Sequence, residues 1–130
     1  MRINHNSLST ESLSLLEEKL KSYKKYEYTN HVIKKMKEKK ITKRQIENTL
    51  KNHEIIEISN NNDKKDIRLL LMSNESYKGF NIVVCVSIDN GNIITCYKNK
   101  KNDTHIKNRE GNNNVNTIIN MLLSGQYELI

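Results

Sequence analysis

The sequence predicts an α+β domain in which N-terminal helices precede a four-stranded antiparallel β-meander and a further helix follows it. Apolar residues recur at helical spacing as far as residue 52, and then in short extended runs as far as residue 98. The pair Asn90-Gly91 separates the last two runs and is typical of a tight hairpin turn. A final apolar stripe over residues 115–123 has helical spacing again.

A chain of 130 residues fits one domain, because chains of this length bury roughly two-thirds of their unfolded surface. We therefore expect residues 1–130 to form a single domain. The longest apolar run, residues 82–86, is too short to cross a bilayer, and the N-terminus lacks the pattern of a signal peptide. These features predict a cytoplasmic site of action and no contact with a membrane.

Two helices are predicted before residue 40. The first covers about residues 10–26, where leucines recur at helical spacing. Thr29 or Asn30 can cap the second, which runs to about residue 39.

A capping box starts the third predicted helix. Thr42 is the N-cap and Gln45 lies three residues on, so each side chain can accept a hydrogen bond from the backbone N–H of the other. Ile41 and Ile46 flank the box as a hydrophobic staple. This helix is expected to end near residue 52.

Runs rich in isoleucine, leucine and valine between polar turns predict the four strands. They cover residues 54–58, 67–72, 80–88 and 93–98. The last helix, over residues 115–123, is expected to dock on the sheet or on a partner.

A two-residue hairpin turn would place Cys85 opposite Cys96, close enough for a disulfide. Two buried free thiols are nevertheless the interpretation that a reducing cytosol favours. The same register puts Thr95 and Tyr97 on the strand face that carries the alternate valines and isoleucines. A three-residue turn with a bulge would put both on the opposite face.

Basic residues are concentrated in one part of the chain. There are 22 Lys and Arg against 15 Asp and Glu, a net charge of +7. Residues 19–51 alone hold twelve cations and three glutamates. Such a face predicts an anionic partner, either a phosphate backbone or an acidic protein. A compositional bias is the alternative explanation, since 18 of the cations are lysines and only four are arginines.

The sequence predicts no metal site and no cofactor. Neither cysteine lies in a CxxC motif, and the histidines lack the spacing of metal ligands. No glycine-rich phosphate loop is present, because the four glycines are far apart.

The segment from Thr29 to Tyr97 contains the pattern T-x-H-x-x-x-K-M-x-x-K-x-I-T, then a helix, then strands that end in I-T-x-Y. It resembles a small bacterial family of unknown-function domains found in toxin and mobile-element contexts. Members of that family have arginines where this chain has Lys35 and Lys39, and often a histidine where it has Asn81.

The resemblance implies a branch of the barnase, EndoU, colicin and RelE-like (BECR) fold, whose members are mostly metal-independent ribonuclease toxins. It implies a family-like core at residues 29–98. Residues 1–28 would then be an N-terminal helical extension, and residues 99–130 a loop and the C-terminal helix.

The activity that this resemblance implies is endonucleolytic cleavage of RNA by attack of the neighbouring 2′-hydroxyl. Such cleavage needs a base, an acid and cations that stabilise the developing charge. The residues expected to supply them are His31 as base or acid, Arg44 and Arg68 as phosphate ligands, and Thr95 and Tyr97 as hydroxyl donors. The lysines expected to bind RNA are Lys34, Lys35, Lys39 and Lys43.

The expected partners are RNA, with transfer RNA among the candidates, and an acidic immunity or antitoxin protein. The protein would act in the cytoplasm, and delivery from another cell is one route to it. Two alternatives stay open: a non-catalytic basic module that binds RNA or protein, and the neutralising partner of a toxin. Single residues have alternatives too. His31 and Tyr97 can be packing residues, and the tyrosines at 23, 26 and 28 can either stack on bases or pack a helix.

Overall fold

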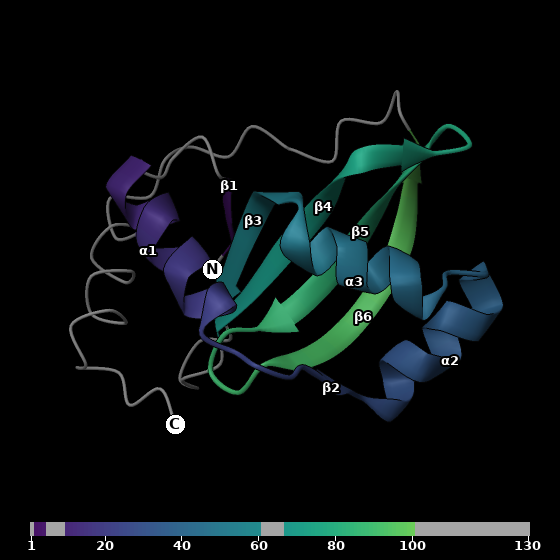
Figure 1. Ribbon diagram of the computed structural model, residues 1–130, viewed down its shortest axis with the longest axis horizontal. Helices are drawn as coiled ribbons and strands as arrows, with labels where there is room; N and C mark the ends of the chain where they lie inside the picture. The colour runs from purple at the N-terminus through teal and green to yellow at the C-terminus, as the bar shows by residue number, and fades with distance from the viewer. Residues whose placement is uncertain (1, 5–9, 61–66, 101–130) are drawn as a thin grey trace.

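The computed structural model describes residues 2–4, 10–60 and 67–100. Within these ranges, three α-helices cover one face of a six-stranded sheet (Figure 1). The helices are α1 (Thr10–Lys21), α2 (Asn30–Lys39) and α3 (Lys43–Lys51). The strands are β1 (Arg2–Asn4), β2 (Glu27–Tyr28), β3 (His53–Asn60), β4 (Ile67–Tyr77), β5 (Phe80–Ser87) and β6 (Asn92–Lys100).

The sheet has the strand order β1-β3-β4-β5-β6-β2. Its four long strands, β3 to β6, pair antiparallel in sequence, as the predicted meander requires. The α+β class is confirmed, but the prediction of only four, all-antiparallel strands was wrong at the edges. There β1 pairs antiparallel with β3, and β2 pairs parallel with β6. Segments of three and two residues carry no readable periodicity.

The hydrophobic core lies between the helices and one face of the sheet. Along β4 the buried residues alternate, with Ile67, Leu69 and Leu71 facing the helices. The central strand β5 is buried on both faces, since Val83 is as fully covered as Val84. The helices contribute Leu16, Leu20, Val32 and Ile46, and the α2–α3 turn contributes Ile41. The predicted helix over residues 115–123 lies outside the described residues.

The first helix is shorter than predicted. It ends at Lys21 and not near residue 26. The backbone N–H of Glu27 donates to the carbonyl of Gly91, and that of Thr29 donates to the carbonyl of Ile93. Pairing with the open edge of β6 gives these backbone N–H groups partners outside the helix, so tertiary context decides where α1 ends.

Both predicted N-caps are present. In the Thr42 capping box, the Gln45 N–H donates to Thr42 Oγ1 at 3.1 Å, and the Thr42 N–H donates to Gln45 Oε1 at 2.9 Å. Thr29, and not Asn30, caps α2 by accepting the N–H of Val32. The loop between α2 and α3 is consequently only three residues long, Lys40 to Thr42.

The β5–β6 hairpin differs from the predicted register by one residue. Val84 pairs with Cys96 and Cys85 with Thr95, while a register shift between Cys85 and Val86 leaves an extra residue in β6. This is the bulge that reverses the faces of the β6 side chains. Cys96 therefore joins the core under the helices, and Thr95 turns to the other face.

The two cysteines are free thiols, as expected, and the bulge explains why they do not pair. They lie on opposite faces of adjacent strands instead of opposite each other. Only 1% of Cys96 is exposed, and burial raises the pKa of its thiol to about 11. The thiol therefore stays protonated at neutral pH, where it acts as a small apolar side chain.

Gly91 cannot be replaced without strain. Its φ of +74° is unfavourable for residues with a Cβ, and a Cβ built there would lie 2.8 Å from Cδ1 of Tyr23. That ring is held by the hydrogen bond from its hydroxyl to the carbonyl of Ile88. The close approach of the Tyr23 ring to the hairpin thus requires glycine.

We predict that Gly91→Ala lowers the free energy of unfolding by about 3 kcal/mol, since it adds a clash to the backbone strain. Gly79→Ala is the matched control, because Gly79 also has a positive φ, +86°, but open space around it. The control should lose only about 1 kcal/mol. Urea denaturation measures both, and equal losses would contradict the role of the Tyr23 contact.

Candidate functional site

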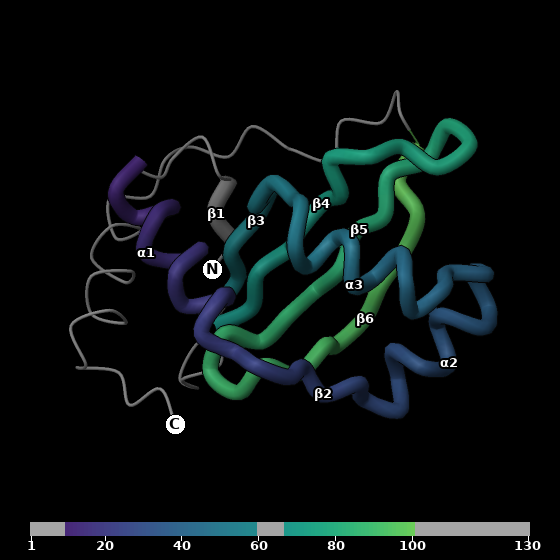
Figure 2. The backbone as a smooth tube through the Cα atoms, in the orientation of Figure 1, coloured from purple at the N-terminus to yellow at the C-terminus, as the bar shows by residue number. Residues whose placement is uncertain are grey.

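The connecting segment, residues 22–29, links α1 to α2 without helical structure and brings Tyr23, Tyr26 and Tyr28 together. Figure 2 shows it running beside β6 before the chain enters α2. The hydroxyl of Tyr26 donates to the carbonyl of Leu20 at 2.8 Å, which closes the segment back onto the end of α1. The hydroxyl of Tyr23 is bonded to the β5–β6 turn. Both rings are thus fixed by their hydroxyls.

Thr29 joins this segment to both the sheet and α2. Its Oγ1 accepts the N–H of Val32 at 3.1 Å and donates to the carbonyl of Ile93 at 2.8 Å. One hydroxyl therefore caps the helix and anchors it to β6. This double role sets where α2 begins and holds Tyr28 at the sheet edge.

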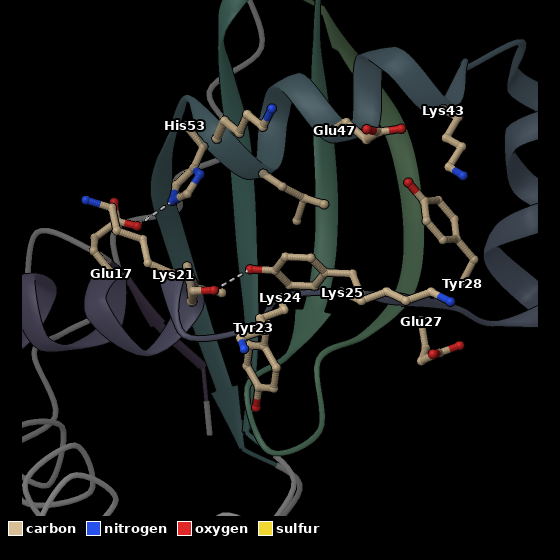
Figure 3. A pocket seen from close by; sticks show the side chains of 14 residues that line it. Glu17, Lys21, Tyr23, Lys24, Lys25, Glu27, Tyr28, Lys43, Glu47 and His53 are labelled. Atoms are coloured by element: carbon tan, nitrogen blue, oxygen red, sulfur yellow. Dashed lines mark hydrogen bonds and ion pairs between the residues drawn. The ribbon is translucent and has the colours of Figure 1, made fainter.

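A pocket of about 810 Å³ lies between α1, the connecting segment and α3 (Figure 3). Its walls contain aromatic rings, two leucines, five lysines, three glutamates and one histidine. The residues are Glu17, Leu20, Lys21, Tyr23, Lys24, Lys25, Tyr26, Glu27, Tyr28, Lys43, Glu47, Leu50, Lys51 and His53. This volume lies within the range of pockets that hold small organic ligands, about 300–1,000 Å³.

His53 and Glu17 close one end of the pocket (Figure 3). Nδ1 of His53 lies 2.8 Å from the carbonyl oxygen of Thr49, which can only accept, so Nδ1 carries a proton. Nε2 lies 2.6 Å from Oε1 of Glu17, and a second proton must lie between these two atoms. Since the His53 side chain is only 5% exposed, this pair acts as a link between α1 and the end of α3.

Tyr28 lies between the rings of Tyr23 and Tyr26 on one side and the lysine-rich helices α2 and α3 on the other. Nζ of Lys43 lies 5.6 Å from the centroid of its ring, a cation–π contact. Its hydroxyl is buried and makes no hydrogen bond in the part of the chain that the structure describes. Burial, with smaller effects from Glu47 and Cys96, raises the pKa of Tyr28. Burial, together with nearby Tyr23 and Glu17, raises the pKa of Tyr26 to about 12. Neither phenol is therefore ionised at neutral pH.

A second, more apolar hollow of about 590 Å³ lies on the other side of Tyr28. Tyr28 and Lys43 line both hollows. Its other walls include Met36, Ile41 and Ile33, and Ile33 is 41% exposed. The Tyr28 ring and the Lys43 side chain thus form a partition between two adjoining hollows.

Most of the length of α2 separates His31 from Arg44. His31 lies in the first turn of α2 and Arg44 in the first turn of α3, which begins where α2 has ended. The length of α2 from residue 31 onward is roughly 12 Å. Both side chains are exposed, and neither lines the two hollows.

The other predicted catalytic residues lie on the sheet face away from the helices. Arg68 alternates with the core residues Ile67 and Leu69, and is half-buried. Thr95 pairs with Cys85 and Tyr97 with Val83, and neither partner belongs to the core under the helices. The structure thus divides the five predicted catalytic residues between two faces of the sheet. Their roles in catalysis stay a prediction.

The predicted RNA-binding lysines are on the helices. Lys34, Lys39 and Lys43 are exposed and Lys35 is half-buried. Glu38 lies 3.3 Å from the Lys35 ammonium and 4.0 Å from that of Lys34. Such exposed i,i+3 and i,i+4 pairs contribute little to stability, so these lysines remain available to an anion.

Sequence reasoning missed Glu17, Glu47 and His53 as pocket residues. Whether these three side chains come to line one pocket depends on the path of the connecting segment, for which the sequence carries no periodic signal. In residues 2–4, 10–60 and 67–100, no three His, Cys, Asp or Glu residues are grouped so as to hold a metal ion. No described helix is long and apolar enough to span a membrane.

A family model described as a domain of unknown function, DUF4258, matches residues 28–107, more than half of the chain. The chain belongs to the DUF4258 family. No curated protein and no solved structure matches it. The expected resemblance of residues 29–97 to an unknown-function family is thereby confirmed, whereas the BECR toxin type stays a proposal.

The DUF4258 match begins at Tyr28, so it divides the pocket wall into two parts. The pocket residues in the matched region are Tyr28, Lys43, Glu47, Leu50, Lys51 and His53. The remaining wall comes from α1 and the connecting segment, which precede it. In this DUF4258 protein the N-terminal segment therefore completes a pocket that the matched region forms only on one side.

We predict that Tyr28→Phe raises the free energy of unfolding by about 1 kcal/mol, because it removes a buried hydroxyl that lacks a hydrogen bond and keeps the ring. Tyr26→Phe is the matched control. It removes a hydroxyl bonded to Leu20 and should destabilise by a similar amount. Urea denaturation of both variants checks the difference in sign. A loss of stability in Tyr28→Phe would show that its hydroxyl has a partner.

Proposed function

We propose that this DUF4258 protein binds RNA and holds the phosphate backbone on a basic surface formed by α2 and α3. The basic surface consists of Lys34, Lys35, Lys37, Lys39, Lys40, Lys43, Arg44 and Lys51. Between residues 30 and 51 these eight cations face only two acidic residues, Glu38 and Glu47. This concentration of charge on adjoining helices is the observation that carries the proposal.

The first turn of α3 supports a role beyond stability. Lys43 and Arg44 stand there, with no acidic residue, although the partial positive charge of a helix N-terminus disfavours cations. The Thr42 capping box already satisfies the backbone N–H groups of Thr42 and Gln45. The two cations therefore weaken the helix slightly and present positive charge to solvent, where phosphates can approach.

We predict that Arg44→Glu raises the free energy of unfolding by roughly 0.5 kcal/mol, through the helix dipole, and weakens RNA binding. Lys78→Glu, with the same charge change in the β4–β5 turn, is the matched control. Thermal denaturation and fluorescence anisotropy with labelled RNA measure the two effects. The slope of log K against the logarithm of the salt concentration should become shallower by about 0.7 for each single-strand phosphate contact that is lost. Equal weakening in both variants would indicate net charge alone.

Metal-independent cleavage of that RNA is a second candidate function. His31 favours it, because its imidazole is exposed and makes no hydrogen bond or ion pair with another described residue. As a base it would take the proton of a 2′-hydroxyl, whose oxygen then attacks the adjacent phosphorus. The 5′-oxygen leaves with a proton taken from water, and a 2′,3′-cyclic phosphate remains. Such an enzyme would suit a cytoplasmic ribonuclease toxin held in check by an acidic immunity or antitoxin protein.

We predict that the purified protein, incubated with total RNA and a chelator, produces discrete fragments that end in a cyclic phosphate. His31→Ala should abolish them, because it removes the proposed base. Asn30→Ala, the exposed neighbour in the same helical turn, is the control. Intact RNA at every protein concentration would exclude cleavage and leave RNA binding as the function.

A further inference from the structure

We propose that the pocket between α1 and α3 binds the base of an unpaired nucleotide, and that lysines at its rim hold the adjoining phosphate. This inference rests on the proposed RNA binding and deepens it by naming the substrate class, single-stranded over double-stranded RNA. The shared chemistry is a nucleobase joined to a phosphate. A free nucleotide and an RNA strand can both supply it, and the tests below separate these sources.

The aromatic wall is ordered before any ligand binds. The rings of Tyr23 and Tyr26 have centroids 5.7 Å apart and planes inclined by 47°, so they form a tilted wall and not a closed stack. Their hydroxyls are both bonded to backbone carbonyls, which fixes the rings. Nζ of Lys19 lies 5.1 Å from the centroid of the Tyr23 ring, and Gly91 packs against that ring, so the base would stack on Tyr26, beside Tyr28. Such stacking orders few side chains, and the entropic cost of binding is correspondingly small. Stacking on tyrosine also tolerates every base, because each has a π-face.

The charges around the pocket fit a base and its phosphate. Lys21, Lys24 and Lys25 are exposed along one side, and Lys43 and Lys51 on the other. Three glutamates also line the pocket, and Glu17 is already paired with His53. Glu27 and Glu47 can accept hydrogen bonds from the N–H groups of a base, which a phosphate lacks. The mixture of lysines and carboxylates therefore suits a nucleotide better than a phosphate alone.

A base can enter only if it is not paired. In a duplex, both faces of each base are stacked on neighbours and its Watson–Crick edge is occupied. The pocket can thus take a base from a single strand, a loop or a bulge. The basic surface alone would bind both forms of RNA through their phosphates. A preference for single strands is consequently the signature of the pocket.

The test compares a labelled 2′-O-methyl RNA octamer with its blunt duplex by fluorescence anisotropy. The 2′-O-methyl group removes the attacking hydroxyl, so cleavage cannot disturb the measurement. The wild type should bind the single strand at least about tenfold more tightly than the duplex at equal salt. Tyr28→Leu should lose most of this preference, because it removes an aromatic ring that lines the pocket beside Tyr26. Tyr77→Leu, the same change in a half-buried tyrosine outside both hollows, is the matched control.

A second measurement uses the unaltered protein and so does not depend on whether a variant folds. Adenosine 5′-monophosphate is titrated at millimolar concentration while backbone amide resonances are recorded. Shifts concentrated in residues 20–28 and 43–53 support the pocket and show that a free nucleotide suffices. If the octamer produces these shifts and the nucleotide does not, an RNA strand is the source.

The outcomes separate this inference from the function on which it rests. Equal affinity for single strand and duplex, with the pocket resonances unmoved by either probe, overturns the base site and leaves phosphate binding on the basic surface intact. Failure of every RNA to bind overturns the proposed function itself. A loss of preference in Tyr77→Leu as large as in Tyr28→Leu also counts against the pocket.

Discussion

The parallel pairing of β2 with β6 is the constraint on which the rest of the structure depends. Two backbone hydrogen bonds and the hydroxyl of Thr29 hold the connecting segment along the open edge of β6. To reach that edge, the chain leaves the helical path after Lys21. The segment then carries three tyrosines across the gap between α1 and α3, and α2 starts from the same anchor. The pocket and the basic surface both follow from the path of the connecting segment from α1 to the edge of β6.

Apolar packing at α1 and exposed charge along the connecting segment together explain why so small a domain has a pocket. Leu16 and Leu20 bury one side of α1, and the Glu17–His53 contact joins that helix to the end of α3. Further along, the lysines that line both sides are exposed, because burying an unpaired cation costs far more than leaving it in water. The aromatic rings therefore stay half-exposed beneath a charged rim, an arrangement suited to a ligand with a flat apolar part and a negative charge.

Much of the fold could be predicted, because its signals are local. The Thr42 capping box, the three helix starts and the four long strands are each encoded in a few neighbouring residues. The predicted hairpin register was wrong by one residue, because the sequence left open whether the turn carries a bulge, and the structure has one at Ile94. That single residue moved Thr95 and Tyr97 to the other face. The pocket could not be predicted either, because Glu17 and His53 meet across 36 residues of chain.

Photo-crosslinking tests most directly whether RNA lies along the connecting segment. A single-stranded 2′-O-methyl octamer containing 4-thiouridine is irradiated with the wild-type protein, and the crosslinked peptides are identified by mass spectrometry. The structure predicts crosslinks in the connecting segment and in α3, with Tyr26 and Tyr28 among the modified residues. Crosslinks confined to the sheet face of Thr95 and Tyr97, or none at a saturating RNA concentration, would contradict it.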